Sequence, residues 1–191
     1  MSVTSSERLK DFFLSLVRQS FGQLGVGDRP ITDYIATVLT DFSRSERLLA
    51  LRGADGRRLT SVVEMMLSQI SPSDRTRVLG ERELRKHIGD YTLFMSGLFR
   101  RFVERGGYLD YYLEEGARSY HEVSRLAAGL DTPPHQPNHL MFEELSKGFE
   151  HYSGALDFMR KCYFSSSAGD DPFAGFYRHV QGWVRNGLSN N

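Results

Sequence analysis

The chain repeats apolar residues in steps of three and four along three stretches, and this spacing limits what it can fold into. Such a stripe lies on one face of an α-helix, so three stripes in one chain predict helices packed side by side. The stripes are Leu84, Ile88, Tyr91, Met95, Leu98 and Phe102; Leu109, Leu113, Gly116, Tyr120, Val123 and Ala127; and Phe142, Leu145, Phe149, Tyr152, Leu156, Met159 and Tyr163. We therefore expect an all-α fold, a bundle of about six to seven helices with mainly antiparallel neighbours.

Further helices are predicted before the first stripe. Apolar residues at helical spacing run over Leu9–Phe21, and the glycine-rich residues 22–27 then end that helix. Asp28 and Pro30 open a second helix, because proline near the first turn loses no backbone hydrogen bond there. A third, shorter helix is expected over residues 60–70.

The segment just before that third helix is the least helical part of the sequence. Residues 48–51 form a short apolar run, and Asp55-Gly56 is a pair typical of tight turns. We expect one small β-hairpin near residues 48–59, or an irregular loop packed by its leucines. A lone hairpin is marginally stable in water, so either structure would have to pack on the helices.

The whole chain, residues 1–191, is expected to form a single helical domain, since this length buries roughly 70% of the surface that the unfolded chain exposes. Three prolines within residues 129–139 exclude regular structure there, and Asn138 can cap the helix that follows. Residues 165–171 read as a flexible linker. The apolar C-terminal helix after it, residues 172–188, should dock on the bundle or on a partner.

Composition excludes several classes of function. Lys+Arg and Asp+Glu both number 24, so the basic surface typical of nucleic-acid-binding proteins is missing, and no nucleic acid is expected as a partner. No stretch approaches the roughly 20 apolar residues that a membrane span needs, and no signal peptide is evident. The single cysteine, Cys162, excludes a disulfide within the chain. This suits a reducing compartment, so we expect a soluble, cytoplasmic protein.

Three ionisable residues, Glu83, His87 and Asp90, share one helix face because they are spaced by four and three. His87 and Asp90 are the candidate catalytic residues, either of them as a general base. Glu83, His87, Glu115 and His121 are candidate metal ligands, since metal sites in bundles take carboxylates and imidazoles from facing helices. No Glu-x-x-His pair occurs in the sequence, so the alternative stays open that these residues are structural, with Asp90 capping a helix or pairing with an arginine.

Tyrosines are the other candidate group. A buried tyrosine combines a large apolar ring with a hydroxyl that needs a hydrogen-bond partner. The candidate ligand-binding residues are Tyr91, Tyr112, Tyr120 and Tyr152. Their hydroxyls can meet inside the bundle beside His87 and Asp90 and form a polar, aromatic pocket for a small ligand. In the alternative interpretation the rings are core packing with satisfied hydroxyls.

Three segments resemble a group of uncharacterised bacterial proteins. They are residues 87–99 (HIGDYTLFMSGLF), 116–120 (GARSY) and 145–150 (LSKGFE). The similarity spans most of the chain and includes the Asp55-Gly56 turn and the helix around Met65-Met66. The resemblance implies a bacterial source and a helical fold; it implies no activity and no catalytic residue.

Two hypotheses about the function of the protein remain open. The first is a soluble helical binding module that acts through a protein partner or a small ligand. The alternative is an enzyme or metal-binding protein whose site lies between helices 83–102 and 109–127. The run Leu48–Leu51 and the face Phe173–Val184 are candidate partner surfaces, and either can form a homodimer. The sequence identifies no cofactor.

Overall fold

The structure, a computed structural model, describes residues 5–44, 74–128, 137–164, 175–176 and 178–182. The main helices are α1 (Ser5–Leu24), α2 (Arg29–Ser43), α5 (Asp74–Leu98), α6 (Arg100–Arg105), α7 (Leu109–Ala127), α8 (His139–Lys147) and α9 (Phe149–Tyr163). The described residues 175–176 and 178–182 are helical as well. None of the described residues lies in a strand, which confirms the all-α prediction. The hairpin near 48–59, the helix over 60–70 and the linker 165–171 lie outside the described residues.

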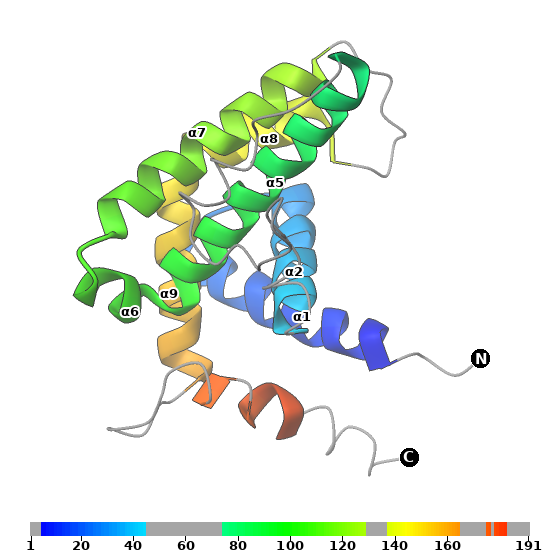
Figure 1. Cartoon of the computed structure of the whole chain (residues 1–191). Helices are drawn as coiled ribbons and strands as arrows, with labels where there is room; N and C mark the ends of the chain where they lie inside the picture. The colour runs from blue at the N-terminus through cyan, green and yellow to red at the C-terminus, as the bar shows by residue number, and fades with distance from the viewer. Residues whose placement is uncertain (1–4, 45–73, 129–136, 165–174, 177, 183–191) are drawn as a thin grey trace.

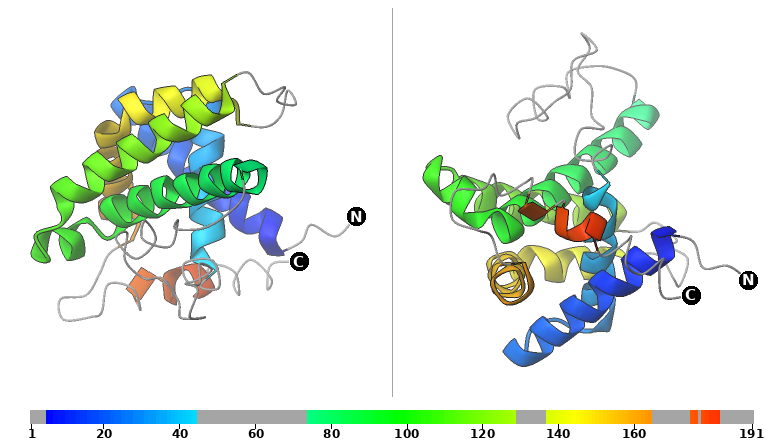
Figure 2. Two further views of the ribbon diagram at one scale, coloured as in Figure 1. Left: turned by 45° about the horizontal axis from the view of Figure 1, so that its top comes forward. Right: turned by 90° about the horizontal axis from the view of Figure 1, so that it is seen from below.

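Helix α5 is the centre of the arrangement. It packs against α7 on one side and against α2 and α9 on others. Figure 1 shows α5 and α7 running antiparallel, with α6 at the turn between them. In the left view of Figure 2, α7 and α8 lie together above α5, and α2 crosses α5. A residue on α5 can therefore contact several neighbouring helices at once.

Polar side chains begin two of the helices as the sequence predicts. Asp28 caps α2 by accepting a hydrogen bond from the backbone N–H of Ile31 at 3.1 Å, and Pro30 stands in the first turn. Asn138 caps α8 in the same way, accepting from the N–H of Met141 at 3.0 Å. Within the described part of the chain, no helix is long and apolar enough to cross a membrane.

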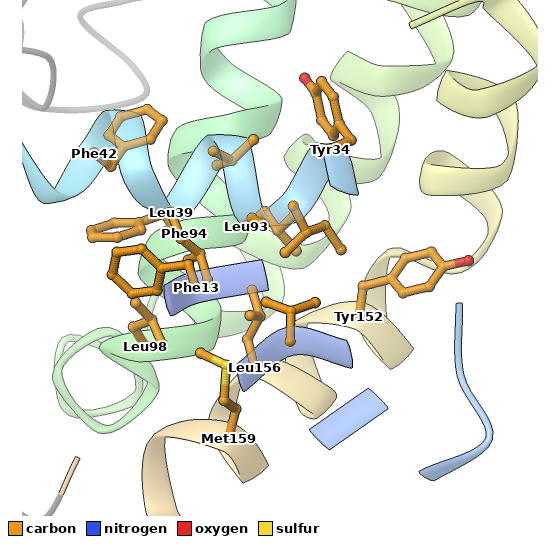
Figure 3. Close-up of a cluster of buried hydrophobic side chains, with 14 of the residues drawn as sticks. Phe13, Tyr34, Leu39, Phe42, Leu93, Phe94, Leu98, Tyr152, Leu156 and Met159 are labelled. Carbon is orange, nitrogen blue, oxygen red and sulfur yellow. The ribbon is translucent and has the colours of Figure 1, made fainter. Parts of the chain in front are cut away.

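The core is rich in aromatic rings. Figure 3 shows Phe13, Phe42 and Phe94, from α1, α2 and α5, gathered with leucines of α2, α5 and α9. The rings of Phe42 and Phe94 stack with their centroids 5.2 Å apart. Phe176, near the C-terminus, is buried in the same cluster, with its ring centroid 5.9 Å from that of Phe94. Val180 is buried beside it, so this part of the 173–184 face is covered by the bundle itself.

Two of the predicted helices are each divided in the structure. The stripe from residue 142 to 163 belongs to two helices, α8 and α9, which meet at Gly148. The helix expected over residues 83–102 breaks at Phe99, where α5 ends and α6 begins. The Phe99 N–H still bonds to Met95 and its carbonyl accepts from Val103, so the chain bends without losing the hydrogen-bond ladder on either side. The bend places the Phe99 ring in the core.

Glycines inside α5 and α7 allow the helices to approach closely. A Cβ on Gly89 would lie 2.7 Å from ring carbons of Tyr120, and one on Gly116 would lie 2.1 Å from the Phe149 ring. Contacts this short do not occur between real atoms, so any side chain would force the helices apart. Helix α5 continues through Gly89. Close helix packing, and not a helix end, therefore explains these glycines.

We predict that Gly116→Ala lowers the free energy of unfolding by about 1–3 kcal/mol, because its methyl overpacks a closed core. Gly154→Ala is the matched control, since a Cβ on this glycine in α9 meets nothing within 4 Å. It should stabilise the protein by about 0.5–1 kcal/mol, as alanine favours helix over glycine. Urea denaturation followed by circular dichroism measures both, and equal effects of the two substitutions would contradict the described packing of α7.

Candidate functional site

A pocket of about 350 Å³ lies between α2 and α5. Its polar lining comprises Tyr34, Thr37 and Asp41 of α2 and Glu83, Lys86, His87 and Asp90 of α5, and its apolar lining comprises Val38, Phe42 and Leu84. The face that carries Glu83, His87 and Asp90 therefore does meet a pocket. The opposite wall of that pocket is α2, whereas the sequence had pointed to the space between α5 and α7.

The carboxylate of Asp90 is the innermost polar group of this pocket, with 5% of the residue exposed. Its Oδ1 accepts hydrogen bonds from the hydroxyls of Tyr34 on α2, at 2.6 Å, and Tyr120 on α7, at 2.8 Å. Its Oδ2 accepts a hydrogen bond from the Lys86 ammonium at 2.7 Å. One side chain thus connects three helices, and both of its oxygens have donors.

Burial fixes the protonation state of the two tyrosines. Loss of solvent around the hydroxyl raises the pKa of Tyr34 well above its ordinary value, and the negative charge of Asp90 raises it further. The same two causes, in the same order, raise the pKa of Tyr120. Both hydroxyls therefore keep their protons at neutral pH and remain donors to the carboxylate.

Lys86 places a positive charge in the pocket. Its Nζ lies 2.7 Å from Oδ2 of Asp90 and 5.3 Å from the centroid of the Tyr34 ring, within the range of a cation–π contact. About a third of the lysine side chain is exposed, whereas Asp90 is buried. The carboxylate is therefore the fixed member of this ion pair, and the lysine lies on the solvent side.

His87 and Glu83 lie farther out along the same face of α5. His87 is half-buried, and the centroid of its ring lies 5.5 Å from that of Phe42 on α2. Glu83 is exposed at the rim. The imidazole is thus part of the pocket wall, and the Glu83 carboxylate adds negative charge where the pocket meets solvent.

The four candidate tyrosines do not meet in one pocket. Only Tyr120 reaches Asp90. Tyr91 and Tyr112 pack against each other, with ring centroids 6.2 Å apart. The Tyr152 ring borders the core, but Figure 3 shows its hydroxyl pointing away from the cluster, and it donates to Glu144 at 3.4 Å. Burial, with a contribution from the Glu144 carboxylate, raises the pKa of Tyr152 to about 12.

Tyr152 instead lines a second pocket, of about 450 Å³, where α2 and α8 begin. The capping residues Asp28 and Asn138 of these helices and the Glu144 carboxylate also line it. The side chains of both caps already accept backbone hydrogen bonds of their own helices, and the Tyr152 hydroxyl is bonded to Glu144. The polar groups of this pocket thus serve the helix caps and the Tyr152–Glu144 bond, whereas the α2–α5 pocket also carries the partly exposed ammonium of Lys86, which favours it as the candidate site.

The candidate metal ligands are separated as well. Glu115 is buried, and its carboxylate accepts hydrogen bonds from Arg85 at 3.0 Å and from Arg118 and Ser119 at 3.3 Å. His121 is exposed on α7. Among the residues that the structure describes, no group of three or more His, Cys, Asp or Glu side chains could hold a metal ion. Glu115 therefore acts as an anchor for arginines of α5 and α7.

Tyr34 and Lys86 are the hydrogen-bond partners of Asp90 that sequence reasoning missed. A signal for each was present. Lys86 stands four residues before Asp90 on the predicted helix, the spacing of a helical ion pair. Tyr34 falls in the apolar stripe of the second helix, where a buried hydroxyl must find a partner. Neither signal identifies Asp90 as the acceptor for Tyr34, because the two residues are distant in sequence.

No protein-family model, no curated protein and no solved structure matches the chain. The resemblance to bacterial proteins therefore stays a prediction. The class that fold and site define is a small all-α protein with a pocket of mixed polar and apolar lining between two helices.

We predict that Tyr34→Phe and Tyr120→Phe each lower the free energy of unfolding by about 1.5–3 kcal/mol, since each removes a hydrogen bond to a buried carboxylate. The control is Tyr108→Phe, because Tyr108 is 60% exposed. Its effect should stay within about 0.5 kcal/mol. Chemical denaturation gives all three values. If the two buried variants behave like the control, the hydrogen bonds to Asp90 do not stabilise the fold.

We also predict that stability falls as the pH rises above about 10, the ordinary pKa of tyrosine. The pKa values of Tyr34 and Tyr120 are raised by folding, so their contribution is complete below the unfolded pKa and is lost above it. Denaturation curves across this alkaline range measure the loss. The Tyr34→Phe/Tyr120→Phe double variant should lose less stability than the wild type; an equal slope would contradict the assignment.

Proposed function

We propose that the protein is a helical binding module that holds a small ligand in the α2–α5 pocket. The pocket itself supports this proposal most directly: it has about 350 Å³, an apolar surface from Val38, Phe42 and Leu84, and several polar groups. Known ligand sites typically measure about 300–1,000 Å³ and combine apolar walls with a few polar groups that orient the ligand. The α2–α5 pocket fits both criteria.

The inner wall of the pocket is rigidly built, which favours binding. Asp90 holds α2 through Tyr34 and α7 through Tyr120, and all three side chains are buried. A ligand that meets groups already held in place loses less conformational entropy on binding than one that must order them. The Asp90 network therefore supports a pre-formed site.

The enzyme hypothesis has weaker support. Asp90 already accepts three hydrogen bonds, and two of them come from buried tyrosines on α2 and α7. This favours an anchoring role for Asp90 over that of a general base. His87 is the remaining candidate base in the pocket wall, and catalysis by it stays a hypothesis.

The protein-partner hypothesis has a candidate surface of its own. Phe102, Tyr108 and Tyr111, at the α6–α7 end of the molecule in Figure 1, are 51%, 60% and 38% exposed. Exposed aromatic residues are frequent in protein interfaces. Nothing about this surface indicates which partner covers it, whereas the pocket has a defined volume and chemistry. The small ligand is therefore the better supported choice.

We predict that a library of small fragments contains ligands whose NMR titration perturbs amides of α2 and α5 around the pocket. Thr37→Phe places a large ring in the pocket and should weaken these ligands about tenfold or more, since it occupies their volume. The matched control is Glu114→Phe, an equally bulky change at an exposed position on α7, which should leave their affinity unchanged. Circular dichroism checks that both variants fold. Binding that perturbs other surfaces, or that Thr37→Phe leaves intact, would refute the proposal.

A further inference from the structure

We propose that the ligand of the α2–α5 pocket is an organic cation, a molecule whose ammonium group takes the place that the Lys86 ammonium holds beside Asp90. This inference rests on the proposed function and adds the chemical class of the ligand. It is carried by an interaction already formed in the pocket, in which a buried carboxylate and an aromatic ring hold an ammonium group.

The position beside Asp90 is built for a positive charge. Asp90 is buried and is held by two tyrosine hydroxyls at Oδ1, so its Oδ2 has a fixed direction. The ammonium of Lys86 lies 2.7 Å from Oδ2 and 5.3 Å from the centre of the Tyr34 ring. Carboxylate and ring face are the two groups with which proteins recognise organic ammonium ions.

Lys86 can leave this position. It is joined to the backbone by a flexible four-carbon chain and is partly exposed, so its ammonium can move into solvent. An ordered lysine side chain gives up rotamer freedom, which it regains on release. Asp90 would keep both tyrosine donors after the exchange, and its negative charge would be balanced by the ligand. Lys86 thus acts as a tethered competitor for the site.

The remaining charges of the pocket also favour a cation. Beside the Asp90 carboxylate, the exposed Glu83 carboxylate stands at the rim of the pocket. When Lys86 swings out, these two negative charges disfavour an anionic ligand. The organic part of a cation has Phe42 and Val38 to pack against. An alkyl or aryl amine therefore fits both the charge and the apolar surface.

The test compares three probes of one shape: 2-phenylethylamine, 2-phenylethanol and 3-phenylpropanoate. Their affinities are measured at pH 7 by NMR titration on the wild type, on Lys86→Met and on Lys147→Met. Lys147 is the matched control because it forms an i,i+4 ion pair with Glu143 on an exposed surface. We expect the wild-type pocket to bind the amine and to bind the alcohol about tenfold or more weakly, since the alcohol cannot form the charged contact.

Removal of the competitor should strengthen binding. Lys86→Met should increase the affinity for the amine about two- to fivefold, the range expected for freeing a partly exposed ion pair, and Lys147→Met should change nothing. If the alcohol or the propanoate binds in the pocket as well as the amine does, or if Lys86→Met weakens the amine, the cation inference is overturned while the pocket remains a binding site. If neither these probes nor the fragment library perturbs the pocket, the proposed function itself fails.

Discussion

The buried carboxylate of Asp90 is the interaction on which the arrangement of the helices depends. Burial of a carboxylate away from water costs roughly several kcal/mol of solvation free energy. Hydrogen-bond donors inside the protein have to offset this cost. Here the donors come from α2, α5 and α7, so the charge is satisfied only when all three helices are in place. A shift of α2 along α5 would leave Asp90 without Tyr34, and a shift of α7 would leave it without Tyr120. The apolar core stabilises many arrangements of amphipathic helices, whereas this network selects one of them.

The same interaction explains where the pocket lies. Gly89 lets the Tyr120 ring lie directly against α5, so α5 and α7 are in close contact beside Asp90. Between α2 and α5, beside Tyr34, Lys86 and His87, lies the pocket. Figure 3 shows the Tyr34 side chain projecting away from the hydrophobic cluster, with its hydroxyl at the far end. The pocket thus begins where the apolar core ends, and Asp90 marks the boundary between them.

Features that depend on residues close together in the sequence could be predicted, whereas contacts between residues far apart in the sequence could not. The caps at Asp28 and Asn138 and the shared face of Glu83, His87 and Asp90 depend on residues within a few positions of one another, and these predictions agree with the structure. The helix positions within the described residues agree as well, apart from the divisions at Phe99 and Gly148. The contact of Tyr34 with Asp90 spans 56 residues, and no local pattern indicates which helix will face Asp90. For the same reason the sequence shows which helix face each of the four candidate tyrosines lies on, but not which side chains each of them contacts. The division at Gly148 was missed because the stripe continues across it: the periodicity of side chains does not show where the backbone bends.

The hydrogen bonds of Asp90 also explain how the proposed ligand could bind beside a buried charge that stabilises the fold. If Asp90 depended on Lys86 alone, a ligand that took the lysine's place would put the fold at risk whenever it dissociated. Because Tyr34 and Tyr120 both donate to Oδ1, the structural duty is concentrated on one oxygen, and Oδ2 faces the pocket with a partner that comes from the solvent side. In the proposed exchange, Oδ1 would keep its stabilising donors while a ligand replaces Lys86 at Oδ2. Burial keeps the tyrosine hydroxyls protonated, so the donors to Oδ1 stay in place.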